Sequence, residues 1–92
     1  MPTFRKRPVE VKAALISELI LCAKKHWSEL PDWVASAYEA GKIIFLPSSI
    51  HVFTSEGRML GEQDDWLIQG VKGELYPCKP DVFAATYDEV KP

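Results

Sequence analysis

The side chains best suited to metal binding are two cysteines and two histidines, Cys22, His26, His51 and Cys78. Cys22 and His26 stand four residues apart, so a helix would place both on one face, and His51 and Cys78 could complete a tetrahedral set. Structural zinc sites normally use closely spaced ligand pairs, however, and the second pair is widely separated along the chain. Cys22 as a core residue and His26 as a helix-end residue explain the pattern more simply, so we predict no metal site.

Ser48, Ser49 and the neighbouring acids Asp64 and Asp65 are the remaining candidates for catalysis. A nucleophilic serine needs a base and an orienting group, and it is commonly framed by a Gly-x-Ser-x-Gly turn, which this sequence lacks. Both serines follow Pro47 and are typical turn formers, and two adjacent acids between strands are typical of a solvated turn. We therefore predict no catalytic residue and no cofactor.

A third group of residues could bind a small anion. Lys72 lies in the glycine-flanked turn GVKG, with Tyr76 and Lys79 shortly after it and Trp66 shortly before it. A lysine can engage a phosphate while an aromatic ring stacks on a base, so Trp66, Lys72, Tyr76 and Lys79 are the predicted ligand-binding residues. The alternative is that the lysines are ordinary solubility charges at strand ends.

The composition predicts a soluble intracellular domain that spans residues 1–92. Hydrophobic residues make up 47% and charged residues 26% of the 92 residues, which is ordinary for a globular protein. A formal net charge of −2 argues against a general nucleic-acid binder. No apolar run is long enough to span a membrane, and the basic N-terminus is not followed by the apolar stretch of a secretory signal. With two cysteines and no Cys-x-x-Cys pair, both thiols are expected to be reduced.

One strand and two helices are predicted in the first half of the chain. A strand is expected over residues 9–13, where apolar and charged residues alternate. Ser17 is placed to cap the following helix. The second helix begins at Pro31 and ends at Gly41, which suits a left-handed cap. The helix side chains expected to face inward are Leu19, Ile20, Ala23, Trp27, Trp33, Ala37 and Ala40.

Five short strands and a terminal helix are predicted after residue 42. The continuous apolar run 43–46 favours a strand covered on both faces. Residues 50–54 and 58–62 form a predicted hairpin turning at Gly57, and residues 66–69 and 74–76 form a second hairpin. Pro77 requires the last strand to be an edge strand or to end there. Pro80 opens a short helix with Val82, Phe83 and Tyr87 as its contacts. The expected fold is α+β, a small antiparallel sheet of five to six strands with two helices on one face and a short C-terminal helix.

Two segments carry a resemblance to a known family. They are FRKRPVEVKA at residues 4–13 and DWLIQGVKGELYPCKPDVF at residues 65–83, followed by Thr86-Tyr87. Together they resemble the patterns FRKxPVxVxA and DWxIxGVKGExYPCKPDxFxxTY of a family of small proteins encoded by tailed bacteriophages and prophages. Asp64 departs from the pattern, because the family usually has glycine at that position. Aspartate tolerates a left-handed backbone better than most residues, so the turn can survive.

The resemblance implies an accessory protein acting in the cytoplasm of a bacterial host. By analogy with other small phage proteins, it suggests a non-enzymatic protein that sequesters a nucleotide-derived immune signal, with a homodimer or larger symmetric assembly as a companion expectation. Two alternatives remain open. One is a protein-interaction module that binds a host or phage protein through the edge near Tyr76 and Pro77 or through the aromatics Trp33 and Tyr38. The other is a small nucleotide-processing enzyme.

Overall fold

The computed structural model describes residues 1–5 and 9–90, so Lys6, Arg7 and Pro8 of the first motif lie outside the described residues. In these described residues an α+β arrangement with antiparallel strands is found. The helices are α1 (Ile16–Lys25), the 3-10 turn η1 (Trp27–Glu29), α2 (Asp32–Glu39) and α3 (Pro80–Thr86). The strands are β1 (Lys12–Leu15), β2 (Ile43–Phe45), β3 (Ser49–Thr54), β4 (Gly57–Glu62), β5 (Trp66–Gln69) and β6 (Leu75–Cys78).

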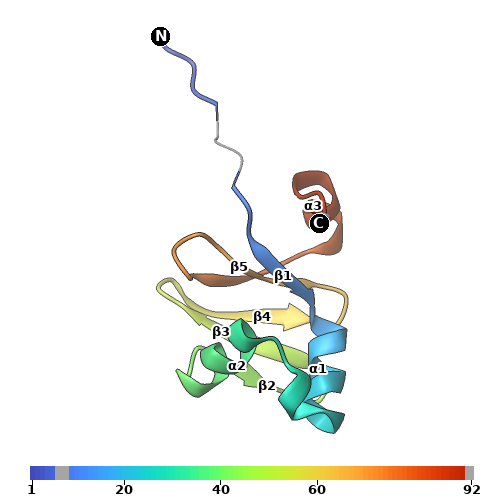
Figure 1. Ribbon diagram of the computed structural model, residues 1–92. Helices are drawn as coiled ribbons and strands as arrows, with labels where there is room; N and C mark the ends of the chain where they lie inside the picture. The colour runs from blue at the N-terminus through green and yellow to red at the C-terminus, as the bar shows by residue number, and fades with distance from the viewer. Residues whose placement is uncertain (6–8, 91–92) are drawn as a thin grey trace.

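The strands form two three-stranded sheets, ordered β1-β5-β6 and β2-β3-β4, where the sequence predicted one sheet. Figure 1 shows β1 and β5 in one layer and β2, β3 and β4 in another. The sheets approach each other where β6 lies alongside β3 and β4. Gly61 makes this approach possible, because a Cβ atom there would lie 2.5 Å from Ile16 Cδ1 and 3.3 Å from Pro77 Cβ. Pro77 lies in an edge strand, as expected, since it has no N–H to donate to a ladder.

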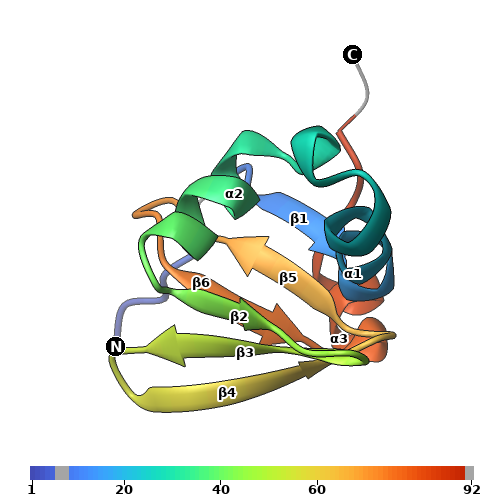
Figure 2. The same ribbon diagram turned by 90° about the horizontal axis from the view of Figure 1, so that it is seen from below.

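The hydrophobic core lies between the helices α1 and α2 and the inner faces of both sheets. Figure 2 shows α1 and α2 on the same side of the molecule. From α1 to β6, every element except η1 and β4 contributes to the core. Its buried members are Ile16, Leu19, Ile20, Leu30, Val34, Ala37, Ile43, Ile50, Val52, Leu67 and Leu75. Trp27 and Ala40 are exposed, although the helical periodicity predicted that they face inward. No helix within residues 1–5 and 9–90 is long and apolar enough to cross a membrane.

Two turns follow the glycine pattern. Gly41 has φ +76°, and the N–H groups of Gly41 and Lys42 donate to the carbonyls of Tyr38 and Ala37, which satisfies carbonyls at the end of α2. Gly57 has φ +113° and closes the β3–β4 hairpin, where the Thr54 hydroxyl donates to its carbonyl at 2.8 Å. Both predicted turns are therefore confirmed.

Two predicted strands are wrong in detail. The first strand begins at Lys12 and not at Val9, which is 52% exposed and precedes any pairing partner in β5. The apolar run 43–46 forms β2, but this strand is covered on one face only. Ile43 is buried in the core while Ile44 is 44% exposed, so only the inner face of β2 joins the core.

Candidate functional site

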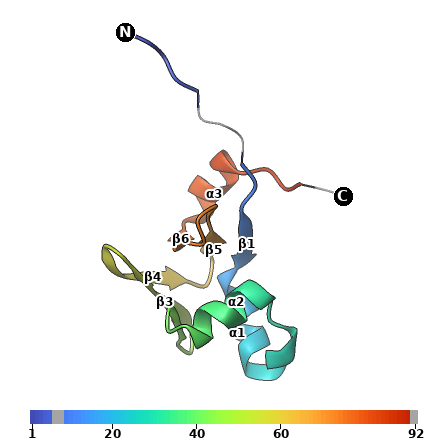
Figure 3. The same ribbon diagram turned by 60° about the vertical axis from the view of Figure 1, so that its left-hand side comes forward.

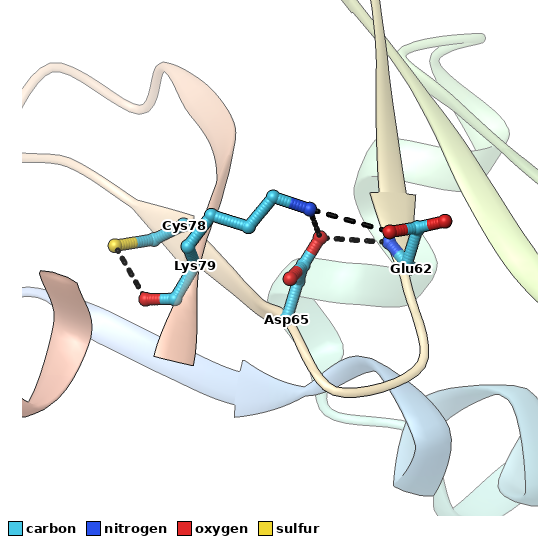
Figure 4. Close-up of polar contacts among 4 residues, drawn as sticks. All are labelled: Glu62, Asp65, Cys78 and Lys79. Carbon is cyan, nitrogen blue, oxygen red and sulfur yellow. Dashed lines mark hydrogen bonds and ion pairs between the residues drawn. The ribbon is translucent and has the colours of Figure 1, made fainter. Parts of the chain in front are cut away.

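The turn between β4 and β5 is organised by one buried carboxylate, Asp65. Its side chain is 3% exposed, and Oδ2 accepts a hydrogen bond from the backbone N–H of Glu62 at 2.9 Å. The Lys79 ammonium donates to the same oxygen at 3.1 Å and to Glu62 Oε2 at 3.3 Å (Figure 4). The hydrogen bonds to Asp65 and Glu62 raise the pKa of the Lys79 ammonium. The carboxylate and the lysine are thus already engaged with each other within the fold.

The same turn supplies the N-terminal cap of α1. The N–H groups of Ile16 and Ser17 donate to the carbonyls of Asp65 and Gln63, both at 3.0 Å. α1 begins at Ile16, its N-cap is Leu15, and no side chain caps it. The prediction that Ser17 is the cap is therefore wrong. The first N–H groups of a helix need acceptors, but any acceptor satisfies them. Here the acceptors are carbonyls 46 or more positions away along the chain, so the sequence around Ile16 does not reveal the cap.

The hollow beside this turn is open and acidic. It has a volume of about 480 Å³ and is lined by Ser48, Glu62, Gln63, Asp64, Asp65, Lys79 and Pro80. Three carboxylates surround its single ammonium, so the electrostatic environment opposes an anionic ligand. Ser48 shares the hollow with the acids, but neither histidine lines it. The geometry provides a structural ion pair and not a nucleophile–base pair.

A second aromatic group lies between the β1-β5-β6 sheet and α3. Trp66 stacks on Phe83 with ring centroids 4.2 Å apart and planes only 9° apart, and Phe83 contacts Tyr87 at 5.3 Å. The hydroxyls of Tyr76 and Tyr87 share a hydrogen bond of 3.1 Å, and Ile68 is fully buried. Figure 3 shows α3 beside β5 and β6, on the side away from α1 and α2. The aromatic residues of the C-terminal segment thus hold α3 on the outer face of this sheet.

The four predicted ligand residues do not converge on one site. Trp66 and Tyr76 project from the same face of the sheet, because their cross-strand partners are Cys78 and Ile68, but α3 packs on both. Lys79 is paired with Asp65. Lys72 lies on the exposed β5–β6 turn, where its backbone N–H donates to Glu74 Oε1 at 3.0 Å. Three of the four side chains therefore have partners inside the fold.

The cysteines and histidines are also separate. Cys22 donates from Sγ to the carbonyl of His26 at 3.2 Å, which is a local helix-end contact. Both cysteines are free, and burial, followed by the charges of Asp65 and Asp81, raises the pKa of the Cys78 thiol. Across residues 1–5 and 9–90, no group of three or more His, Cys, Asp or Glu side chains is arranged to hold a metal ion.

A surface that the sequence indicated only through Tyr38 is formed by three aromatic residues from three elements. Trp27 of η1 meets Tyr38 of α2 edge-to-face at 4.9 Å, and both lie 5.9 Å from the ring of Phe45 in β2. Phe45 packs against the core, whereas Trp27 and Tyr38 remain 44% and 43% exposed. We call this group the aromatic surface cluster.

Similarity to known proteins adds nothing to this geometry. Comparisons with protein-family models, with curated proteins and with solved structures find no match to this chain. The residues themselves therefore carry the functional argument.

Trp27 was not predicted as a surface residue, because its spacing placed it on the buried stripe of α1. The helix ends at Lys25, before Trp27 is reached.

The Tyr76 hydroxyl gives a testable alkaline effect. Burial, and next its hydrogen bond to Tyr87, raise the pKa of Tyr76 above the ordinary value of 10.0. The unfolded chain therefore releases this proton at lower pH than the folded chain, so this contribution is complete below about pH 10 and is lost as the pH rises further. We expect Tyr76→Phe to reduce the loss of stability between pH 9 and pH 11, measured as urea midpoints by circular dichroism. Tyr38→Phe is the matched control, and an equal reduction in both variants would contradict the assignment.

Proposed function

We propose that this protein is a non-enzymatic binding protein that recognises a protein partner through its aromatic surface cluster. The observation that carries the proposal is the partial exposure of Trp27 and Tyr38, which meet edge-to-face and pack beside the half-buried Phe45. Trp and Tyr are the residues that most often anchor protein interfaces, because a rigid ring offers a large contact area at a small entropic cost.

The surroundings of the cluster fit an interface rim. His26 and Glu29 lie beside Trp27 in sequence, with 3.8 Å between His26 Nδ1 and Glu29 Oε2, and both side chains are largely exposed. Glu39 and Lys42 lie at the C-terminal end of α2, after Tyr38, and are also exposed. An aromatic centre with a polar border of both signs matches the usual anatomy of a protein interface.

The biological setting is proposed from the sequence resemblance alone. In that setting the protein is a bacteriophage or prophage accessory protein in the cytoplasm of a bacterial host, and its partner is a host or phage protein. An anti-defence role would then consist of blocking a host protein by contact. The internal engagement of Trp66, Tyr76 and Lys79 supports this mode over capture of a phosphate at the predicted residues.

Sequestration of a small anionic ligand such as a nucleotide is the second candidate. One observation favours it, namely a hollow of about 380 Å³ between the β3–β4 and β5–β6 turns that brings Lys42 and Tyr76 to one place. Lys72 lies on the adjoining turn. Glu56 and Glu74 line the same hollow, so its charge is mixed and a phosphate would meet repulsion as well as attraction.

The test compares matched surface variants. Trp27→Ala and Tyr38→Lys are expected to weaken binding of a stoichiometric host protein by at least about tenfold, as expected for the loss of an interface anchor. Val71→Ala, an exposed apolar residue on the β5–β6 turn, should leave binding unchanged. Thermal denaturation of each variant checks the fold, and Tyr38→Lys retains an alkyl stem against Trp27.

Binding that survives both cluster variants would overturn the proposed surface. A parallel thermal-shift panel of cyclic and ADP-ribose-derived nucleotides separates the two candidates. A shift of several degrees that Lys42→Ala and Lys72→Ala abolish would favour the small anionic ligand, since a ligand at a hundredfold excess over Kd stabilises the folded state by about 2.7 kcal/mol.

A further inference from the structure

The outer face of the β2-β3-β4 sheet is defined by its strand register. Ile44, His51 and Leu60 are direct cross-strand partners, so their side chains form one row across the three strands. Phe53 and Arg58 form the next row towards the hairpin turn, and Ser49 and Glu62 form the row at the other end. Because side chains alternate between the faces of a sheet, these residues share the face opposite the buried Ile43, Ile50 and Val52.

This face is unusually apolar for one that meets solvent. Ile44 is 44%, Phe53 40% and Leu60 51% exposed. An antiparallel sheet with one face on the core normally alternates apolar and polar residues, so its outer face should be polar. In Figure 2 no helix crosses in front of the arrows of β3 and β4, and the described core residues of α1 and α2 pack on the inner face. The three apolar side chains thus form a contiguous uncovered patch.

The arrangement of residues around this patch is complementary to itself. Two copies can face each other across a two-fold axis that lies between the sheets and runs along the Ile44–His51–Leu60 row. This axis places the Phe53–Arg58 row of one copy over the Ser49–Glu62 row of the other. Arg58 then lies opposite Glu62 of the second copy, and Glu62 lies opposite its Arg58. The same operation places the large Phe53 ring over the small Ser49 side chain, while Leu60 meets its own symmetry mate.

We propose that this face is the interface of a homodimer, in which the two β2-β3-β4 sheets pack face to face. The two strand directions would be antiparallel apart from the twist of about 30° that is usual for stacked sheets. Two inter-copy Arg58–Glu62 pairs and two Phe53–Ser49 contacts would border the central row, in which Ile44, His51 and Leu60 each lie opposite their own symmetry mates. The charges of Arg58 and Glu62 and the sizes of Phe53 and Ser49 are matched by the same two-fold operation, so a second copy of this chain is the occupant that the face fits.

The affinity should be modest. Three strands about 4.8 Å apart and at most six residues long, at about 3.3 Å per residue, give a sheet face of roughly 300 Å², which is smaller than the about 800 Å² per partner of a standard stable interface. A dissociation constant in the micromolar range is therefore expected, and dimers should form at high protein concentration. The face is separate from the aromatic surface cluster, so the dimer and the proposed protein partner can be tested independently.

Sedimentation velocity between about 1 µM and 1 mM measures the oligomeric state across the expected range. The wild-type chain should shift from monomer to dimer. Leu60→Glu and Arg58→Glu should each raise the dissociation constant at least tenfold, because the first buries a charge and the second opposes two glutamates. Both side chains are exposed, so the fold should be retained. Val71→Glu and Val82→Glu place the same charge on exposed valines elsewhere and should leave the dimer intact.

Charge complementation gives the decisive result. Arg58→Glu and Glu62→Lys should each dimerise at least tenfold more weakly than the wild type when alone, and an equimolar mixture should form a heterodimer of near wild-type affinity in which every pair is again opposite in charge. Glu62 also pairs with Lys79, so thermal denaturation of Glu62→Lys checks that the turn persists. A wild-type monomer at 1 mM, an unchanged dissociation constant in Leu60→Glu, or a mixture that dimerises no better than the separate variants while both are folded would each overturn the proposal.

Discussion

Replacing Asp65 with alanine is expected to lower the free energy of unfolding by about 3 kcal/mol, because the buried carboxylate holds both a backbone N–H and the Lys79 ammonium at this turn. Asp65 is 3% exposed and accepts the Glu62 N–H at 2.9 Å. Without the carboxylate that N–H loses its partner, and the turn whose carbonyls cap α1 loses its internal brace. Hydrogen bonds to a charged, buried acceptor contribute more than neutral ones at the surface.

The loss should appear as a fall in melting temperature of roughly 12–24 °C, at about 4–8 °C per kcal/mol for a domain of this size. Asp64→Ala is the matched control, because Asp64 is exposed and adjacent, and its replacement should change stability by no more than about 0.5 kcal/mol. Lys79→Met should cost less than about 1 kcal/mol, since the Lys79 side chain is 58% exposed and water can replace its ion pairs. If Lys79→Met were as damaging as Asp65→Ala, the ion pair and not the backbone contact would be the stabilising element.

The local elements of the fold were predictable because their signals are local. Apolar spacing indicated both long helices, and glycines with positive φ marked the end of α2 and the β3–β4 turn. Pro80 opened α3 within the expected residues. In each case the residue type constrains its own backbone, so no distant partner has to be known.

The arrangement of the strands was not predictable from such signals. Hairpin turns define which neighbouring strands pair, but they do not say whether β4 continues into β5 within one sheet. Here the Asp65 carboxylate takes the outward N–H of Glu62, and β5 pairs with β1 instead. Lys12–Leu15 was shifted from the expected strand for the same reason, because its register is set by β5 and not by its own alternation.

Prediction of the candidate site failed for the same reason, because it depends on contacts between residues that are distant in the sequence. A lysine beside an aromatic residue is consistent with ligand binding, but the sequence cannot reveal that Lys79 faces Asp65 or that Trp66 lies under Phe83. Packing of a hairpin under a helix is enough to explain the presence of Trp66, Ile68, Tyr76 and Phe83. The structure has that arrangement. Exposed aromatics such as Trp27 become visible only when the end of the helix is known.

The second large effect is expected at Gly61, where the two sheets meet. An added Cβ would lie 2.5 Å from Ile16 Cδ1 and 3.3 Å from Pro77 Cβ, which is closer than atoms of this kind pack. Ile16 is fully buried in the core, and Pro77 is held in β6. Gly61→Val is therefore expected to destabilise the fold by about 3 kcal/mol through overpacking. The positive-φ glycines are at other positions, so steric crowding and not backbone strain is the cause.

A double-mutant cycle can establish that cause. Ile16→Val removes the Cδ1 atom nearest to the added methyl group and should cost about 0.5–1.5 kcal/mol in the wild-type chain. In the Gly61→Ala background the same change should cost less or become stabilising, because it opens the space that the new methyl group needs. Chemical denaturation of the four proteins measures the coupling. Strictly additive effects would show that Ile16 does not limit the approach of the sheets, and that the glycine is required for another reason.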